Sequence, residues 1–189
     1  MNKLKDYIVI VNNALPHSLC DSILKEYANS NEWDQAKINV NNKIIIDKDR
    51  RNCFNILISE NEVISKNFDI RKKIDSVIFK CIGKLCKKYL KKFNRFKISN
   101  DSGYQLLKYE KNSFFEEHVD SYSDIHRTLS CSLILNDNFK GGEFSFFNKK
   151  IIYSLKKGSA ILFPSNFMYP HSVLPVKNGI RYAIVTWLV

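Results

Sequence analysis

The sequence is poor in the residues that mark secreted, fibrous or membrane proteins. Its 189 residues include only five cysteines, four prolines and six glycines, which excludes a collagen-like or linker-like chain. No apolar run approaches the ~20 residues that cross a bilayer. The apolar stretch near the N-terminus is too short for a secretory signal. We therefore expect a cytoplasmic protein with no membrane partner.

The few cysteines do not form a metal-binding or disulfide pattern. They are odd in number, show no C-x-x-C spacing and lie within apolar segments. The sequence therefore predicts reduced and buried thiols. They are Cys20, Cys53, Cys81, Cys86 and Cys131. A chain of this length buries roughly two thirds of its unfolded surface, so folding needs neither disulfides nor a structural metal.

Aromatic residues and positive charge are abundant instead. The 13 Phe and nine Tyr predict a compact core, and we expect a single domain over residues 1–189. The formal net charge is +11. Residues 71–97 alone hold 11 basic residues and one acidic residue, whereas residues 101–189 hold 10 basic and eight acidic ones. The basic excess therefore belongs to one segment rather than to the whole surface.

That basic segment has the period of an amphipathic helix. Its apolar residues recur at intervals of three or four, which places them on one helix face. They are Ile74, Ile78, Cys81, Leu85, Tyr89 and Phe93. Two interpretations of the basic outer face stay open: a solvated face on a support helix, or a binding surface for nucleic acid or another polyanion.

The remaining patterns predict an α+β, mostly β fold. The N-terminal region, residues 1–100, is expected to supply support helices that cover one face of a sheet. Its expected elements are a strand at 7–11, a helix at 18–30 capped by Ser18, strands at 43–47 and 53–58, and a short helix near 60–66. From residue 101 onward, eight short strands separated by turn signals predict a β-sandwich or jelly roll. These strands are 103–109, 114–119, 128–135, 143–147, 150–154, 160–163, 169–174 and 180–188.

Histidine is scarce, with four in the chain, and this limits the candidate metal ligands. His118 and Asp120 are two residues apart, so on a strand they point to the same face. His171 follows 53 residues later on another predicted strand. Two histidines and one carboxylate can hold Fe(II) at three adjacent positions and leave three open. The alternative is a surface histidine beside an aspartate. His17 is expected in a turn or cap and His126 in a polar loop.

A further candidate is Arg181, which lies in an otherwise apolar strand. A buried guanidinium is costly unless an anion pairs with it. Glu143 or Glu110 could be a structural partner. Alternatively, Arg181 binds a carboxylate of a ligand through two parallel hydrogen bonds, next to the proposed metal.

Taken in order, the segments around these residues resemble the catalytic half of the 2-oxoglutarate/Fe(II) dioxygenases, in the prolyl 4-hydroxylase-like branch. The resemblance runs over residues 103–189, and the segment 7–32 also looks like the opening strand and helix of that branch. The matching motifs are YEKNSFFEEHVD (109–120), RTLSCSLILN (127–136), GGE (141–143), KKGSAILFP (156–164), HSVLPVKNGIR (171–181) and the closing Trp187.

This resemblance implies a double-stranded β-helix with His118, Asp120 and His171 as the metal ligands that bind Fe(II). It also implies that Arg181 binds the distal carboxylate of 2-oxoglutarate and that Tyr109 hydrogen-bonds this co-substrate. The implied reaction couples oxidative decarboxylation of 2-oxoglutarate, to succinate and CO2, with hydroxylation of a C–H bond by O2. Ascorbate is a further expected cofactor. The phenylalanines expected to help form a dry barrel interior are Phe144, Phe146, Phe147, Phe163 and Phe167.

Two more residues resemble substrate contacts of prolyl hydroxylases. Arg127 lies in an R-x-x-[T/S] pattern, and Trp187 lies six residues after Arg181. Each also has a simpler interpretation: a solvated loop residue for Arg127, and core packing for Trp187. Phe115 and Asn112 stand where this branch commonly has tyrosine and glycine. The expected substrate is a prolyl residue in a peptide or protein, with a free amino acid or another small molecule as the alternative.

Two other functions rank lower. Nucleic-acid dealkylases of the same superfamily would suit the basic helix, but they typically carry a second arginine six residues after the first, where this chain has Trp187. A non-catalytic jelly-roll binding module would leave the order of His118, Asp120, His171 and Arg181 without a purpose. The abundance of Lys, Asn and Ile suggests an AT-rich genome, and hence a microbial or viral origin.

Overall fold

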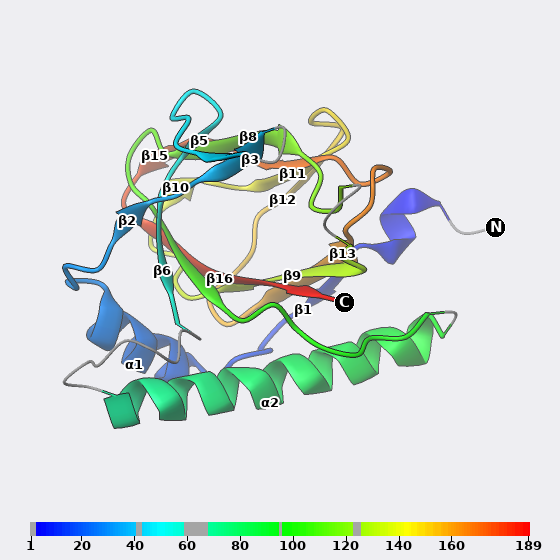
Figure 1. Cartoon of the computed structure of the whole chain (residues 1–189), viewed down its shortest axis with the longest axis horizontal. Coiled ribbons are helices and arrows are strands. Elements are labelled where there is room, and N and C mark those ends of the chain that lie inside the picture. The colour runs from blue at the N-terminus through cyan, green and yellow to red at the C-terminus, as the bar shows by residue number, and fades with distance from the viewer. Residues whose placement is uncertain (1–2, 41–42, 59–67, 95, 123–125) are drawn as a thin grey trace.

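The computed structural model describes residues 3–40, 43–58, 68–94, 96–122 and 126–189. Its strands form two large sheets that enclose a barrel, and helices lie beside one of these sheets (Figure 1). The helical elements are the 3-10 helix η1 (Leu4–Tyr7), α1 (His17–Tyr27) and α2 (Phe68–Lys92). The strands of the N-terminal region are β1 (Val9–Val11), β2 (Asp34–Gln35), β3 (Ile38–Val40), β4 (Lys43–Ile45), β5 (Arg51–Asn52) and β6 (Phe54–Leu57). The strands after residue 101 are β7 (Gln105–Tyr109), β8 (Phe114–His118), β9 (Leu129–Ile134), β10 (Lys140–Gly141), β11 (Phe144–Phe146), β12 (Ile151–Tyr153), β13 (Ala160–Pro164), β14 (His171–Val173), β15 (Val176–Asn178) and β16 (Arg181–Leu188).

The two main sheets differ in size. The larger has seven strands in the order β1-β13-β9-β16-β7-β6-β2, and the smaller has five in the order β12-β11-β14-β8-β5. Two short pairs, β3 with β4 and β10 with β15, complete the described strands. Every described pairing is antiparallel. The predicted mostly β architecture with N-terminal helices is therefore confirmed.

All eight strands predicted after residue 101 are present, each within two residues of its predicted ends. The pair β10 and β15 was not predicted, because both strands lie among turn-forming residues: Asn138, Gly141, Asn178 and Gly179. Their register shifts between Lys140 and Gly141. Gly141 has a φ of +77°, and a Cβ there would lie 2.3 Å from the Pro175 carbonyl oxygen. Only glycine fits such a close approach of backbone in the left-handed region.

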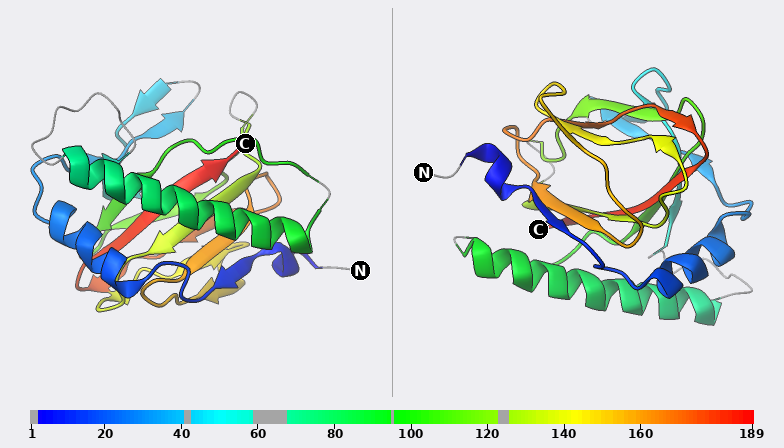
Figure 2. Two further views of the ribbon diagram at one scale, coloured as in Figure 1. Left: turned by 90° about the horizontal axis from the view of Figure 1, so that it is seen from below. Right: turned by 180° about the vertical axis from the view of Figure 1, so that it is seen from behind.

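Helix α2 crosses the outer face of the seven-stranded sheet, beside α1 (Figure 2). Its buried residues are Ile74, Ile78, Ile82, Leu85 and Tyr89. Each side chain of this size contributes roughly 1.5–3 kcal/mol when fully buried. The predicted burial of Cys81 was wrong, since the helical period places Ile82 against the sheet and leaves Cys81 half-buried. The helix also ends at Lys92 rather than at residue 97, so Phe93 packs from the segment after it.

The start of α2 forms ion pairs with the end of α1 and with the segment that follows α1. Both Nη atoms of Arg71 donate to the carboxylate of Glu32 at 2.7 Å, and Nε donates to Glu26 at 3.2 Å. The guanidinium also lies over the Tyr27 ring, 4.8 Å from its centroid. This fork geometry is the strong form of an arginine–carboxylate contact. The contacts hold α2 in one position relative to α1.

Several N-terminal predictions need correction. Tyr7 belongs to η1 and not to a strand, and the helix cap is Pro16 with no side-chain hydrogen bond, so Ser18 lies inside α1. The strands predicted at 43–47 and 53–58 exist in shortened form, but β4 pairs with β3, and β6 pairs with β7 and β2. The short helix predicted near 60–66 lies outside the described residues.

The buried side chains form two clusters. One lies between the seven-stranded sheet and the helices, and the other lies inside the barrel, where Phe144, Phe146 and Phe163 are buried. Phe147 packs partly against the inner cluster. Phe167 is 79% exposed, so its predicted place in the barrel interior was wrong. The barrel therefore has an aromatic interior built from fewer phenylalanines than expected.

All five cysteines are free, as predicted; Cys20, Cys53 and Cys131 are buried, and Cys81 and Cys86 are half-buried. Within the described ranges, no helix combines the length and the apolar composition that spanning a bilayer requires.

Candidate metal centre

Strand pairing brings the two candidate histidine ligands together. His118 is the last residue of β8 and His171 is the first of β14, and the two are directly opposed in the antiparallel register. Residues opposed in this way have their side chains on the same face of the sheet. Asp120 follows β8 in a segment held by a hydrogen bond from its backbone N–H to the Ser165 carbonyl, at 3.2 Å. Asp120 therefore reaches the site from a loop, not from the strand that the spacing predicted.

The three side chains form a compact donor cluster. His118 Nε2 lies 3.5 Å from Asp120 Oδ1, and His171 Nε2 lies 3.4 Å from Asp120 Oδ2. The candidate ligand atoms all lie within 4.8 Å of one another. It is the one such cluster of three or more potential ligands among the described residues. Two imidazoles and one carboxylate on one side of a cavity suit an Fe(II) site with open positions.

The opposite ring nitrogens fix the tautomer of both histidines. The Nδ1 atom of His118 lies 2.7 Å from the Glu116 carbonyl oxygen, and Nδ1 of His171 lies 3.1 Å from the Tyr169 carbonyl oxygen. A carbonyl oxygen only accepts hydrogen bonds, so each Nδ1 must carry the proton. Each Nε2 is then the ring nitrogen that the carbonyl contacts leave free, and it faces Asp120, which is the arrangement that metal binding requires.

Ring packing further restricts the imidazoles. Phe115 stacks on His118 with the ring centroids 3.6 Å apart, and Phe163 meets His171 edge-on at 4.5 Å. Phe115 therefore supports a ligand ring, although it replaces the tyrosine common in the related branch. Asn112, which stands where the related branch commonly has glycine, has a φ of +66°, in the left-handed region. Asparagine tolerates this region better than most residues do, so the turn keeps its shape without glycine.

Asp120 is buried and is held by a short chain of hydroxyl groups. The Ser130 hydroxyl donates to Asp120 Oδ2 at 2.6 Å, and the Ser165 hydroxyl lies 2.8 Å from the Ser130 hydroxyl. Burial alone would raise the pKa of Asp120, but its contacts with His171, His118 and Ser130 hold that pKa well below its ordinary value. The carboxylate is therefore ionised and has a fixed orientation.

His171 is suited to remain neutral. Burial lowers its pKa to about 4, against an attraction to Asp120 that acts in the opposite direction. At pH 7 the ring is therefore uncharged and keeps a free electron pair on Nε2.

Arg181 is the first residue of β16 and is opposed to Tyr109, the last residue of β7. It is only 2% exposed, its Nη2 atom has no hydrogen-bond partner, and burial lowers its pKa. Neither structural partner considered from the sequence pairs with it: Glu110 is 3.1 Å from Lys108, and no described carboxylate forms an ion pair with Arg181. An unpaired buried guanidinium of this kind fits an anionic ligand.

Tyr109 supplies a neutral hydroxyl beside this guanidinium. Its ring centroid lies 5.1 Å from the Arg181 guanidinium carbon, and the side chain is 1% exposed. Burial raises the pKa of Tyr109, so the hydroxyl keeps its proton.

One cavity joins the donor cluster to Arg181. Its lining includes His118, Asp120, His171, Tyr109 and Arg181. Its other walls are largely apolar and come from both sheets: Leu107, Phe144, Phe163, Val173 and Val185. The structure thus places all five of these candidate residues around a single interior space.

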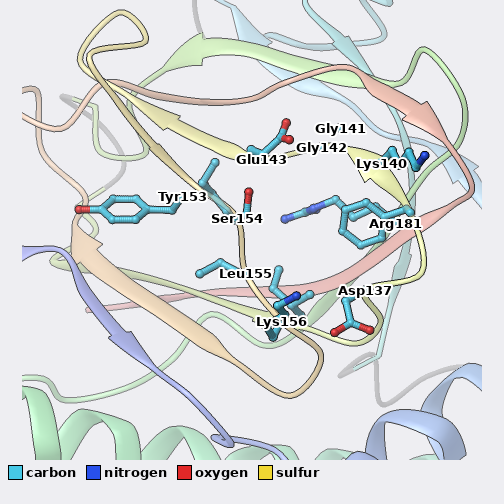
Figure 3. Close-up of a pocket in the computed structure, with 13 residues that line it drawn as sticks. Asp137, Lys140, Gly141, Gly142, Glu143, Tyr153, Ser154, Leu155, Lys156 and Arg181 are labelled. Carbon is cyan, nitrogen blue, oxygen red and sulfur yellow. The ribbon is translucent and has the colours of Figure 1, made fainter.

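Arg181 also lines a second pocket of about 270 Å³. In Figure 3, Arg181 extends from its strand into the space between the sheets, with Ser154 in front of its guanidinium. Lys140, Lys156 and Asp137 lie around the pocket. Glu143 lines it as well without pairing with Arg181.

The donor cluster also opens onto a groove of about 740 Å³. Arg127 and Trp187 line this groove together with His118 and Asp120. The Arg127 guanidinium lies over the Trp187 ring, 3.6 Å from its centroid, and Nη1 donates to the Asp120 carbonyl oxygen at 3.2 Å. Arg127 is therefore not a solvated loop residue, and Trp187 is buried but faces the groove.

The remaining histidines and the basic helix lie elsewhere. His17 begins α1 and its Nε2 lies 3.1 Å from the Lys157 carbonyl oxygen, while His126 is exposed and lies outside the donor cluster. Helix α2 packs on the seven-stranded sheet, whereas the two ligand histidines belong to the five-stranded sheet. The basic face is therefore separated from the metal centre by a layer of the fold.

Sequence reasoning missed three residues at the site. Ser130 carried a partial signal, because it is the last residue of the R-x-x-[T/S] pattern that begins at Arg127, whereas Ser165 carried none. Arg51 lies between the strands predicted at 43–47 and 53–58, but it is 8% exposed and lines both the cavity and the groove. No local pattern identifies it, because its partner strand β8 lies more than 60 residues away in the sequence.

Comparisons with known proteins extend this picture. The sequence model of the 2OG-Fe(II) oxygenase superfamily matches residues 104–189. A PKHD-type hydroxylase of Rippkaea orientalis is 34% identical over 92 residues, which are 43% of this chain and 40% of that protein. A proposed prolyl 4-hydroxylase of Acanthamoeba polyphaga mimivirus is 24% identical over 198 residues, covering 94% of this chain and 72% of that protein. The match therefore spans about 40% of the length of the PKHD-type relative.

The backbone is also similar to a solved structure, a Trichoplax adhaerens prolyl hydroxylase in complex with a hypoxia inducible factor oxygen degradation domain peptide fragment. The TM-score is 0.78 at 19% identity, covering 96% of this chain and 83% of that one. At this level of identity the likeness shows a shared fold, which confirms the predicted jelly-roll architecture.

Proposed function

Because residues 104–189 belong to the 2OG-Fe(II) oxygenase superfamily, we propose that this chain is an Fe(II)- and 2-oxoglutarate-dependent hydroxylase of prolyl residues in a peptide or protein. The observation that carries the proposal is one cavity lined by both a two-histidine, one-carboxylate cluster and a buried arginine without an anionic partner. The named relatives support proline as the target.

The residues of the cavity fit both groups. His118, Asp120 and His171 offer two imidazole nitrogens and one carboxylate oxygen, which suits Fe(II). Arg181 offers the unpartnered Nη2 atom to the distal carboxylate of 2-oxoglutarate, and Tyr109 offers a protonated hydroxyl beside it. When bound together, Fe(II), 2-oxoglutarate and O2 supply the oxidising power that converts C–H to C–OH, while 2-oxoglutarate leaves as succinate and CO2.

The protein's own contribution is positioning and exclusion of water. The carbonyl contacts to both Nδ1 atoms and the Ser130 hydroxyl hold the three ligand side chains before any metal arrives. Arg181 and Tyr109 fix the far end of the co-substrate, so its other end is directed toward the ligands. The apolar walls from the two sheets keep bulk water from the reacting atoms.

The groove beside His118 and Asp120 binds the substrate in this proposal. The stacked Arg127 and Trp187 form a rigid wall there, because the guanidinium is held both by the ring and by the Asp120 carbonyl. Such a wall positions a substrate carbon near the metal centre, and correct positioning of this kind can contribute several kcal/mol to the rate.

Mass spectrometry tests the proposal. The protein is incubated with Fe(II), 2-oxoglutarate, O2 and ascorbate, together with proline-containing peptides, free proline or oligonucleotides. We expect a +16 Da product on peptides, with no product from His171→Ala and normal product from the matched control His126→Ala. Absence of +16 Da on every proline-containing species contradicts the proposed substrate. A product on free proline alone would instead show that the substrate is a small molecule and not a peptide or protein.

A further inference from the structure

Arg51 stands at the point where the groove meets the cavity. It begins β5 and is opposed to Phe115 on β8, the strand that ends at His118. Its guanidinium carbon lies 4.7 Å from the centroid of the Phe115 ring, and that ring stacks on His118 at 3.6 Å. A stacked series of Arg51, Phe115 and His118 thus leads from the groove to a metal ligand.

The guanidinium of Arg51 is buried without being satisfied. Its Nη1 donates to the Lys37 carbonyl oxygen at 2.9 Å, but its Nε atom is buried and has no hydrogen-bond partner. The side chain is 8% exposed, and no carboxylate forms an ion pair with it in the part of the chain that the structure describes. A buried donor without a partner is unfavourable, and a buried positive charge is more so.

The groove around Arg51 favours an anion. Arg50 and Arg127 line the same groove, and neither forms an ion pair in the described ranges. Three acidic residues line it: Glu32 is held by Arg71 at 2.7 Å, Asp120 belongs to the donor cluster, and Asp34 is exposed and forms no ion pair among the described residues. The arginines therefore exceed the carboxylates available to them inside the groove.

We propose that Arg51 is a carboxylate-binding subsite that selects substrates carrying an acidic group close to the carbon to be hydroxylated. The planar guanidinium edge that includes Nε matches a planar carboxylate, which can accept two parallel hydrogen bonds from it. The carboxylate is either an Asp or Glu side chain next to proline in a peptide or the main-chain carboxylate of a free amino acid. This inference rests on the proposed hydroxylase function and defines its substrate class.

Matched acid and amide substrates test the proposal. One arm uses proline peptides that differ only by Glu or Gln at each position within two residues of the proline. The other arm uses L-proline against L-prolinamide. The +16 Da product is measured at low substrate concentration, where the rate reports kcat/KM. We expect the acid to exceed its amide by about tenfold or more in one arm, because hydrogen bonds to ionised groups are the strong ones.

Variants then assign the preference to Arg51. Arg51→Gln should reduce the acid-to-amide ratio to about one, and Arg51→Lys should keep part of it, since the charge remains without the fork. The matched control Arg50→Gln removes the same charge from the neighbouring exposed position and should leave most of the ratio. Thermal unfolding and anaerobic binding of the better acid substrate are measured for each variant, so that loss of folding is separated from loss of recognition.

The outcomes distinguish this inference from the proposed function. Equal rates for acid and amide in both arms overturn the subsite, and so does an acid preference that survives Arg51→Gln. Equal loss of preference in Arg51→Gln and Arg50→Gln assigns it to the general charge of the groove instead. No product from any peptide or amino acid overturns the hydroxylase proposal itself, and the inference falls with it.

Discussion

The two oxygens of Asp120 have different surroundings. Each lies near one histidine, with Oδ1 3.5 Å from His118 Nε2 and Oδ2 3.4 Å from His171 Nε2, but only Oδ2 also accepts a 2.6 Å hydrogen bond from Ser130. An oxygen that already accepts a short hydrogen bond is a weaker metal donor, which favours Oδ1 as the ligand atom. Ser130 is therefore a positioning residue, because it acts on the metal through Asp120. Groups that orient a metal ligand in this way often change metal affinity by 10- to 100-fold.

Ser130→Ala is expected to weaken Fe(II) or Mn(II) affinity by about tenfold, as measured by anaerobic titration calorimetry in the absence of substrate. Ser145→Ala is the matched control, because the Ser145 hydroxyl is equally buried on a strand but has no hydrogen-bond partner. Ser130→Thr keeps a hydroxyl and should restore most of the affinity. Equal metal affinity in Ser130→Ala and wild type contradicts the role given to Ser130.

Arg181 supplies a prediction in which binding and stability change in opposite directions. Arg181→Leu should raise the 2-oxoglutarate concentration needed for half-maximal turnover by about 10- to 100-fold, since a charge-assisted contact is lost. The protein without ligands should be no less stable, because a buried guanidinium without an ionic partner is replaced by an apolar group. Thermal unfolding with and without 2-oxoglutarate measures both effects. An unchanged 2-oxoglutarate requirement, or a large loss of stability without ligand, contradicts this account of Arg181.

At the scale of elements, α2 is held by its apolar face and not by its charges. Ile78 is fully buried against the seven-stranded sheet, whereas the adjacent Phe79 is 60% exposed. Ile78→Ala should lower the free energy of unfolding by about 2–5 kcal/mol. Phe79→Ala, the matched control one position along, should change it by less than about 0.5 kcal/mol. Urea unfolding measures both, and similar effects at the two positions contradict the assigned helix face.

The strands after residue 101 could be predicted because each is bounded by turn residues and carries apolar residues that must be buried. The pairing of these strands could not, since it depends on contacts between residues far apart in the sequence. His118 and His171 are an example: the sequence places each on a strand, but only the register of β8 and β14 makes them neighbours.

The metal ligands and Arg181 were identified from residue types and their order, which the resemblance to a family made specific. The supporting residues were harder to identify. Ser130 needs its partner Ser165, 35 residues later, and Arg51 needs Phe115, 64 residues later. A serine or an arginine has many uses in a protein, and its role becomes visible only when the fold supplies the partner.

For the molecule as a whole, the reactivity of the free thiols reports how well the folded chain shields its interior from solvent. Burial raises the pKa of both Cys20 and Cys86 to about 11. Free cysteine has a pKa of about 8.5, and only the thiolate reacts with alkylating reagents. At pH 8 both thiols are therefore almost entirely protonated in the native protein. Iodoacetamide should label them slowly at pH 8 and rapidly once urea unfolds the chain, as followed by peptide mass spectrometry. Rapid labelling of Cys20 in the native protein contradicts this burial.

The basic helix lies outside the seven-stranded sheet, whereas the ligand cluster lies among the aromatic residues inside the barrel. Helix α2 carries most of the basic excess on the outside, and the ligand cluster lies on the far sheet. The positive charge that enters the proposed chemistry is therefore not that of the helix. It comes from a few arginines that the barrel buries or half-buries: Arg51, Arg127 and Arg181.

The visible spectrum of the protein with Fe(II) and 2-oxoglutarate, recorded under anaerobic conditions before any substrate is added, tests the metal centre most directly. We expect a weak charge-transfer band that requires both additions, disappears in His171→Ala and persists in His126→Ala. A wild-type protein without this band, or a band that survives His171→Ala, would contradict the claim that His118, Asp120 and His171 hold iron beside a co-substrate bound by Arg181.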